Sequence, residues 1–294
     1  MRITRTFPCS VDRRQSAALF RDIGRLIDYA SPGGDIAATT ADGLDTAAWK
    51  DLPPWVRRMS VARRGADIRL ELALDPAAPT TGSEQVAGKL GRALEDWFSQ
   101  AVRPFPRKVF CIGWQKTGTT SLTAALRRLG LLSWHFAPWL IGCRHFHSDP
   151  VAAVPDFDSL ADYAAVSDLP AAAFYRELDR AFPGSLFVFT DRPLDSWLAS
   201  VQAHLQTSLA VDGQPHSVDR WAYGQDRPDA AVLRERYLRH RGEVFDYFAG
   251  RRDFLALDLG QGNPWHPLCR FLGLPEPSIP FPHHNRGGNP AGTL

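Results

Sequence analysis

The sequence predicts an α/β fold in which helices flank a parallel β-sheet that carries a P-loop-like anion-binding loop, preceded by a small α+β domain. Two stretches after residue 104 each run from an apolar segment through a polar turn into helical spacing. This order is typical of a buried parallel strand followed by a helix. The first third has shorter elements and a hairpin pattern instead. With 294 residues, 44% of them hydrophobic, the chain is long enough for two domains.

We expect residues 1–103 to form the small α+β domain and residues 104–294 to form the α/β domain. In the first of these, Gly65 lies at the turn of the hairpin, and prolines at 104 and 106 mark the end. This domain could shape a binding site, form a homo-oligomer, dock a partner, or only pack. The elements expected in it are a strand at 3–9, a helix at 13–29, a loop at 31–34, a weak strand, hairpin arms at 56–63 and 67–74, and an amphipathic helix at 83–102.

The first strand–turn–helix pattern begins at residue 108. Residues 109–112 are apolar and predict a buried strand. Apolar residues then recur at 122, 125, 126 and 129, the spacing of one helix face, and Gly130 suits the end of that helix. Between strand and helix, Gly113 and Gly118 permit a tight turn with inward amides. A helix N-terminus with free amides predicts an anion site.

The loop itself is not a standard Walker A sequence. That motif places a lysine directly after its second glycine. Here Thr119 follows Gly118, and Lys116 stands two residues before the glycine. A strand-to-helix turn without a ligand remains an alternative for this loop taken alone.

The second pattern combines an apolar strand with a cationic turn. Residues 186–190 read as a buried strand, and Asp191, Arg192 and Pro193 follow at once. Pro193 fits the first position of a helix that carries Ser200 two turns later. Arginine presents a planar, permanently charged fork to a phosphate, and a serine on the same side of the helix can add a hydroxyl. Taken singly, Arg192 could be a surface ion pair and Ser200 a solvated hydroxyl.

Both patterns resemble motifs of the sulfotransferase family. The run Gln115-Lys116-Thr117-Gly118-Thr119-Thr120-Ser121-Leu122 is similar to the 5′-phosphosulfate loop, written Pro-Lys-Ser/Thr-Gly-Thr-Thr-Trp/Ser-Leu. The strand with its arginine and a serine eight residues later resembles the family's 3′-phosphate motif. The similarity covers roughly residues 106–290 and looks like a bacterial-type branch of the family.

The resemblance implies a donor, 3′-phosphoadenosine 5′-phosphosulfate (PAPS), used without a metal. It implies donor contacts from Gln115, Lys116, Thr117, Gly118, Thr119, Thr120, Ser121, Arg192 and Ser200. Lys116 is also the candidate for the catalytic cation, because charge builds on the bridging oxygen of the leaving phosphate. The acceptor is expected to be a small molecule with a hydroxyl or an amine.

The acceptor must also lose a proton, and two kinds of residue compete for that role. Many relatives place a histidine in a Thr-His-Leu-Pro segment, whereas this chain has Ser167-Asp168-Leu169-Pro170. Asp168 could therefore be the base, or simply the N-cap of the next helix. His135 is the rival base, with His145 and His147 behind it.

Composition argues against other partners and compartments. A net charge of +2 favours neither nucleic acid nor a membrane surface. No apolar run approaches a membrane span, the four cysteines are scattered, and no His/Cys cluster has zinc spacing. We therefore expect a cytoplasmic protein. Two alternatives stay open: a P-loop small-molecule kinase using ATP and Mg²⁺ held by Asp191, and a non-catalytic nucleotide-binding or interaction module.

Overall fold

The computed structural model describes residues 2–30, 36–40, 43–46, 56–98, 102–143, 155–212 and 216–284. These residues form two compact units, which divide after Val102. The loop predicted at 31–34 and the candidate bases His145 and His147 lie outside the described residues.

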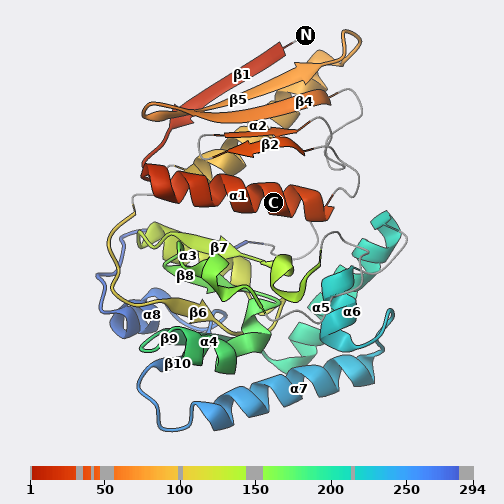
Figure 1. Ribbon diagram of the computed structural model, residues 1–294. Coiled ribbons are helices and arrows are strands. Elements are labelled where there is room, and N and C mark those ends of the chain that lie inside the picture. Colours follow the sequence, from red (N-terminus) through yellow and green to blue (C-terminus); the bar gives the residue numbers. More distant parts are fainter. Residues whose placement is uncertain are drawn as a thin grey trace. The chain divides into compact units, whose positions relative to one another are not determined.

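The first unit contains an antiparallel sheet and two helices (Figure 1). The first strand pairs with the last, and the sheet order is β1-β5-β4-β3-β2. The predicted hairpin is present, with Gly65 in the left-handed conformation at its turn (φ 64°). The second helix begins three residues earlier than predicted. The bounds are β1 Arg2–Pro8, α1 Arg13–Ala30, β2 Ile36–Thr40, β3 Gly43–Thr46, β4 Val56–Arg64, β5 Asp67–Leu74 and α2 Thr80–Phe98.

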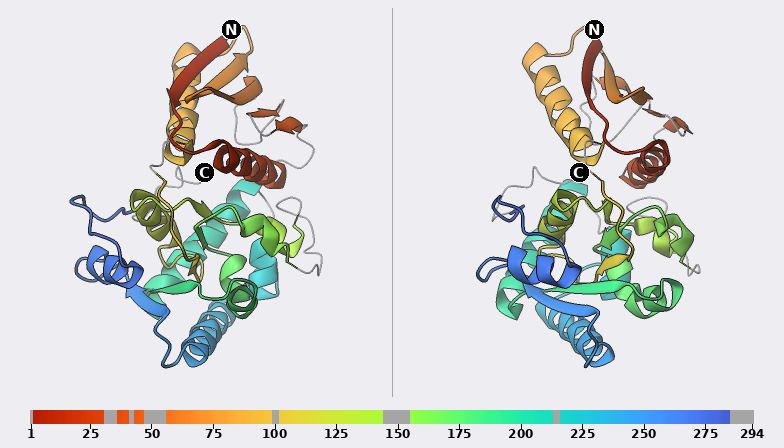
Figure 2. Two further views of the ribbon diagram at one scale, coloured as in Figure 1. Left: turned by 60° about the vertical axis from the view of Figure 1, so that its left-hand side comes forward. Right: turned by 90° about the vertical axis from the view of Figure 1, so that its left-hand side faces the viewer.

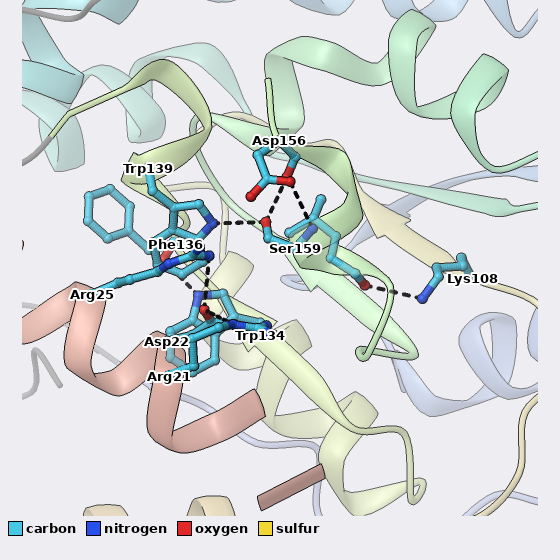
Figure 3. A network of polar contacts seen from close by, with 10 residues as sticks. Arg21, Asp22, Arg25, Lys108, Trp134, Phe136, Trp139, Asp156 and Ser159 are labelled. Atoms are coloured by element: carbon cyan, nitrogen blue, oxygen red, sulfur yellow. Dashed lines mark hydrogen bonds and ion pairs between the residues drawn. The ribbon is translucent and has the colours of Figure 1, made fainter. Parts of the chain in front are cut away.

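Alternation along the strands builds the core of the first unit. In β5, every second residue from Ile68 to Leu74 is buried, so one face of this strand is apolar. Both helices contribute to the same core, since the rings of Phe20 and Phe98 lie 4.8 Å apart. On α1, the carboxylate of Asp22 accepts hydrogen bonds from Arg21 and Arg25 (Figure 3).

The second unit is a five-stranded parallel sheet flanked by helices, as predicted. The strand order is β10-β9-β6-β8-β7, so the chain enters the sheet at its centre. The bounds are β6 Val109–Cys111, α3 Thr119–Arg128, β7 Ser133–His135, η1 Pro138–Ile141, η2 Phe157–Leu160, β8 Ala165–Ser167, η3 Ala171–Phe174, α4 Tyr175–Ala181, β9 Leu186–Asp191, α5 Leu194–Asp212, α6 Ser217–Tyr223, α7 Ala230–Tyr247, β10 Phe254–Asp258 and α8 Trp265–Leu272.

The two faces of this sheet have different cores because successive strand residues point to opposite sides. Val109, Cys111 and Val188 face the apolar sides of α3 and α8. Phe110 and Phe187 face an aromatic layer that includes Phe248, the residue that caps the C-terminus of α7. Figure 2 shows α7 and α8 on opposite sides of β9 and β10. Both faces are thus covered, which leaves the carboxyl edge of the sheet to carry polar side chains.

Candidate functional site

Four neighbouring strands each bring one candidate residue to the carboxyl edge of the sheet. Arg192 follows β9, and the loop with Lys116 follows β6. Asp168 follows β8, and His135 is the last residue of β7. In an open parallel sheet, ligands bind at this edge. The fold therefore gathers residues that are up to 76 positions apart in the sequence.

Side-chain donors fix the loop after β6 by hydrogen bonds to its carbonyl groups. The hydroxyl of Thr117 donates to the carbonyl of Trp114 (2.5 Å). From α5 and the turn before it, Trp197 Nε1 donates to the carbonyl of Gln115 (2.9 Å), and Arg192 Nη1 donates to that of Lys116 (2.8 Å). Three successive carbonyl oxygens therefore have donors within the protein. The first-turn amides of α3 have no acceptor within the helix, so this turn suits an anion.

Space requires glycine at position 113 of this loop, and backbone conformation requires it at position 118. A Cβ on Gly113 would lie 2.0 Å from Thr190 Oγ1 and 2.7 Å from the backbone nitrogen of the same residue. Gly118 has φ 105°, and a Cβ there would lie 2.6 Å from Leu259 Cδ1. The loop consequently packs against β9 at a distance that a side chain at Gly113 would prevent.

His135 and Asp168, rivals in the sequence, lie in contact. His135 Nε2 is 3.0 Å from Asp168 Oδ2. Strand pairing explains this, because His135 of β7 stands opposite Ser167 of β8, and Asp168 is the next residue. The same nitrogen lies 3.3 Å from the hydroxyl of Thr119 and 3.4 Å from that of Thr120, both in the first turn of α3. The imidazole and the carboxylate thus form a pair beside the loop.

The N-cap interpretation of Asp168 is wrong. Its Oδ1 accepts a hydrogen bond from the adjacent amide of Leu169 (2.9 Å), and the helical segment that follows has Pro170 as its N-cap. Burial raises the pKa of Asp168, but the charge and hydrogen bond of His135, the Leu169 amide and the charge of Lys116 outweigh burial and leave the pKa below its usual value. The carboxylate is therefore ionised at neutral pH and is a weak base by itself.

Backbone strain is concentrated at this site. Among the described residues, the non-glycine residues with positive φ are Lys116 (66°), Phe136 (67°) and Asp168 (73°). Each follows a different strand of the same sheet edge, and left-handed backbone at residues other than glycine clusters at functional sites. Burial lowers the pKa of Lys116; the carboxylates of Asp168 and Asp219 act in the opposite direction.

The comparisons with known proteins agree with this geometry. A family model described as a sulfotransferase domain matches residues 108–289, more than half of the chain. The chain belongs to the sulfotransferase family. It is also similar to the Ava biosynthesis cluster protein M of Aspergillus versicolor, with 31% identity over 212 residues, which cover 60% of this chain and 80% of that relative.

Not every residue that the sulfotransferase motif suggests is free to contact a donor. The side chain of Gln115 points to α6, and the hydroxyl of Thr117 bonds to Trp114 and to Thr190 (2.6 Å). Ser121 Oγ accepts from the backbone nitrogen of His284 (3.0 Å) and keeps its own proton for another acceptor. Gln115 and Thr117 therefore shape the loop, and their direct contact with a donor stays a prediction.

Of the predicted 3′-phosphate residues, Arg192 contacts a serine of α5 other than the predicted Ser200. Arg192 Nε donates to the hydroxyl of Ser196 (3.2 Å), one helical turn after the arginine. Ser200 is half-buried and lies one further turn along the same side of α5. Sequence reasoning missed Ser196, although its four-residue spacing to Ser200 places both hydroxyls on one side. The role of Ser200 stays a prediction.

The tryptophans on either side of His135 are held by contacts of their own. Trp134 packs against Trp139 (5.7 Å between rings) and Tyr163 (5.4 Å). Trp139 Nε1 donates to Ser159 Oγ (3.1 Å), and the amide of Ser159 donates to Asp156 (3.2 Å), as Figure 3 shows. These contacts fix the chain within β7 and after it, and so help to set the position of His135.

Asp191, the candidate Mg²⁺ ligand of the kinase alternative, accepts hydrogen bonds from arginines of the protein itself. Arg241 Nε and Nη2 donate to its two oxygens (3.0 and 2.8 Å), and the backbone amide of Arg192 donates to Oδ1 (3.1 Å). Tyr237 completes the arrangement, since its hydroxyl donates to the carbonyl of Arg192 (2.7 Å). The described residues contain no group of three or more His, Cys, Asp or Glu side chains placed to hold a metal ion. Nor does any helix in the described ranges have the length and apolar character needed to cross a bilayer.

Three polar residues near the loop carried no sequence signal. His204 of α5 and Asp219 and Tyr223 of α6 belong to no motif, yet the last two bond directly to Gln115. Burial lowers the pKa of His204, and Asp219, Lys116, His216 and Asp168 all act on it electrostatically. The glutamine that replaces the family's proline was the one available hint, because a buried amide needs polar partners.

Proposed function

We propose that this protein transfers a sulfuryl group from PAPS to a hydroxyl or an amine of a small-molecule acceptor. One observation carries the proposal: Arg192 Nη1 bonds to the carbonyl of Lys116, which joins the expected 3′-phosphate residue to the expected phosphosulfate loop. Family membership supports the reaction class. The choice of donor rests on the residues of the loop and of α5.

These residues fit a donor with two separate anionic ends. The first-turn amides of α3, with Lys116 and the hydroxyls of Thr119 and Thr120, would hold the phosphosulfate. Arg192 with Ser196 or Ser200 would hold the 3′-phosphate. PAPS supplies an activated sulfuryl group on a phosphate leaving group. The 3′-phosphate also separates this donor from ATP, which lacks it.

His135 is the proposed base, with Asp168 as its partner. Because the pKa of Asp168 lies below its usual value, this carboxylate is ionised and stabilises the imidazolium that forms when His135 takes the acceptor proton. An ionised carboxylate at 3.0 Å also fixes the orientation of the ring. In this assignment His135 takes the proton, and Asp168 orients and stabilises His135.

Lys116 is the proposed cation for the leaving group. Its ammonium would meet the bridging oxygen, where negative charge develops as the bond to sulfur breaks. Charge stabilisation by a lysine and backbone amides takes the place that Mg²⁺ has in phosphoryl transfer. We expect the reaction to take place in the cytoplasm, without a metal. The kinase alternative is disfavoured because Asp191 is bound by Arg241.

The decisive experiment is a sulfation assay with an acceptor library. The protein is incubated with PAPS and phenols, alcohols or amines, and mass spectrometry looks for acceptors that gain one SO3 group. Lys116→Ala and His135→Ala serve as controls with strongly reduced turnover. Chelator should leave turnover unchanged. Phosphorylated products with ATP and Mg²⁺ would favour a kinase, and tight binding of 3′-phosphoadenosine 5′-phosphate (PAP) without turnover on any acceptor would favour a binding module.

A further inference from the structure

The side chain of Gln115 joins the phosphosulfate loop to α6. Gln115 Nε2 donates to Asp219 Oδ1 (3.0 Å) and to the hydroxyl oxygen of Tyr223 (2.7 Å). Trp114 Nε1 donates to the same hydroxyl (3.3 Å). Asp219 and Tyr223 are four residues apart and therefore lie on one side of the helix. Two consecutive loop residues before Lys116 are thus bound to α6 by their side chains.

Asp219 is an unusual partner for an amide. Its exposed fraction is 5%, and within the described part of the chain its carboxylate forms no ion pair at bonding distance. A buried carboxylate is costly unless hydrogen bonds or a nearby positive charge compensate it. Lys116, the residue after Gln115, is a cation on which Asp219 acts electrostatically. This cation is half-buried and belongs to the candidate site.

The charges around Lys116 come from every element that packs near it. Asp168 after β8 and Asp219 on α6 favour the charged ammonium, while burial and Arg192 after β9 oppose it. His204 on α5 also interacts with Lys116, and burial lowers the pKa of that imidazole, which leaves it neutral. The two carboxylates are therefore the groups that oppose the effect of burial on the pKa of Lys116.

We propose that Asp219 is a positioning residue for Lys116, acting through Gln115 on the loop and through its charge on the ammonium. The inference rests on the proposed function for the role of Lys116. It adds a residue from α6 to a site otherwise built from the strand ends of the sheet. It also gives a reason for glutamine where the sulfotransferase motif has proline: an amide can bind α6, and proline cannot.

Two isosteric variants separate the hydrogen bond from the charge. Asp219→Asn keeps an oxygen that can accept from Gln115 and removes the negative charge. Gln115→Met keeps the size of the side chain at position 115 and leaves the charge of Asp219 in place. It removes the hydrogen bonds of Gln115 to Asp219 and Tyr223. Tyr223→Phe removes one of the two acceptors of Gln115 and serves as a second test if Gln115→Met fails to fold. Asp226→Asn is the matched control, because Asp226 is an exposed carboxylate in the turn after α6 whose only ion pair among the described residues, with Arg220, is long (3.8 Å).

The charge can be measured on Lys116 without any turnover. The chain has four lysines, namely Lys50, Lys89, Lys108 and Lys116, so protein labelled with ¹³C at the lysine ε-carbon gives at most four signals, and Lys116→Ala identifies one. We expect the Lys116 signal to titrate at a lower pH in Asp219→Asn than in the wild type, and to stay in place in Asp226→Asn. The alkaline limb of the kcat profile should move in the same direction.

The hydrogen bonds can be measured by PAP affinity. We expect Gln115→Met and Tyr223→Phe to weaken PAP binding by about two- to tenfold, the range for one neutral hydrogen bond. An unchanged Lys116 titration in Asp219→Asn, or wild-type PAP affinity in both other variants, overturns the inference. If the wild-type protein binds no PAP, the proposed function fails, and the lysine titration still decides whether Asp219 acts on Lys116.

Discussion

Arg192 Nη1 lies 2.8 Å from the carbonyl oxygen of Lys116, so the side chain expected to bind the 3′-phosphate also holds the loop expected to bind the 5′-phosphosulfate. Two parts of one ligand site therefore share a residue. The loop end of this contact is itself under strain, since Lys116 has a left-handed backbone. A change at Arg192 should consequently act on both ends of the donor.

Arg192→Ala should weaken PAP binding by about ten- to a hundredfold, because a charge-assisted hydrogen bond contributes roughly 1.5–3 kcal/mol. Calorimetry of the variant with PAP and with AMP tests this. The AMP affinity should fall as well, though less, through the loosened loop. Arg234→Ala on α7, an exposed arginine, is the control. Equal affinity of the wild-type protein for PAP and AMP would remove the 3′-phosphate assignment.

Lys116→Ala should lower kcat by about 10²–10³, the range for one lost oxyanion donor, and change PAP affinity much less. The reason is that the contact strengthens only as the bridging oxygen gains charge. Steady-state kinetics at saturating PAPS separates the two effects. A raised KM with unchanged kcat would mean that Lys116 holds the donor without acting on the transition state.

His135→Ala should lower kcat by about 10²–10⁴, the usual contribution of a positioned base. If Asp168 acts only through His135, then Asp168→Asn should cost less, and the double variant should be no worse than His135→Ala alone. A double-mutant cycle on kcat measures this coupling. Additive losses would show that the two residues act independently.

The pairing of Asp168 should also appear in the acid stability of the protein. Its folded pKa lies below the usual value, so the unfolded chain binds the proton at higher pH than the folded chain does. The resulting stability is fully present above the unfolded pKa of about 3.9 and is lost as the pH falls through the folded pKa. Melting temperatures of wild type and Asp168→Asn should therefore differ near pH 7 and approach each other below about pH 4. Asp226→Asn should show no such dependence on pH.

The regular elements around the loop could be predicted because their signals are local. The strand at Val109–Cys111, the helix at Thr119–Arg128 and the strand at Leu186–Asp191 follow from apolar runs and helical spacing. Gly130 follows the C-terminus of α3 as expected, in the left-handed conformation (φ 83°). Anion-loop geometry is equally local, since it needs only a strand end, glycines and a helix start.

The relationship between His135 and Asp168 could not be predicted, because it depends on strand order. Nothing in either segment shows that β8 inserts between β6 and β7. The cap interpretation failed for a similar reason: a left-handed Asp168 turns its carboxylate toward β7 and away from the next helix. Asp219 was missed because its partner is a glutamine more than a hundred positions earlier.

The left-handed backbone at Lys116, Phe136 and Asp168 lowers the thermal stability of the protein at a site that its proposed activity needs. Each such residue costs roughly 1–2 kcal/mol relative to a relaxed backbone, and glycine would carry almost none of that cost. Glycine at Lys116 or Asp168 would also delete the ammonium or the carboxylate on which the proposed reaction depends. A search for variants that survive heating, made without an activity screen, should therefore collect glycine at these positions and lose sulfation first.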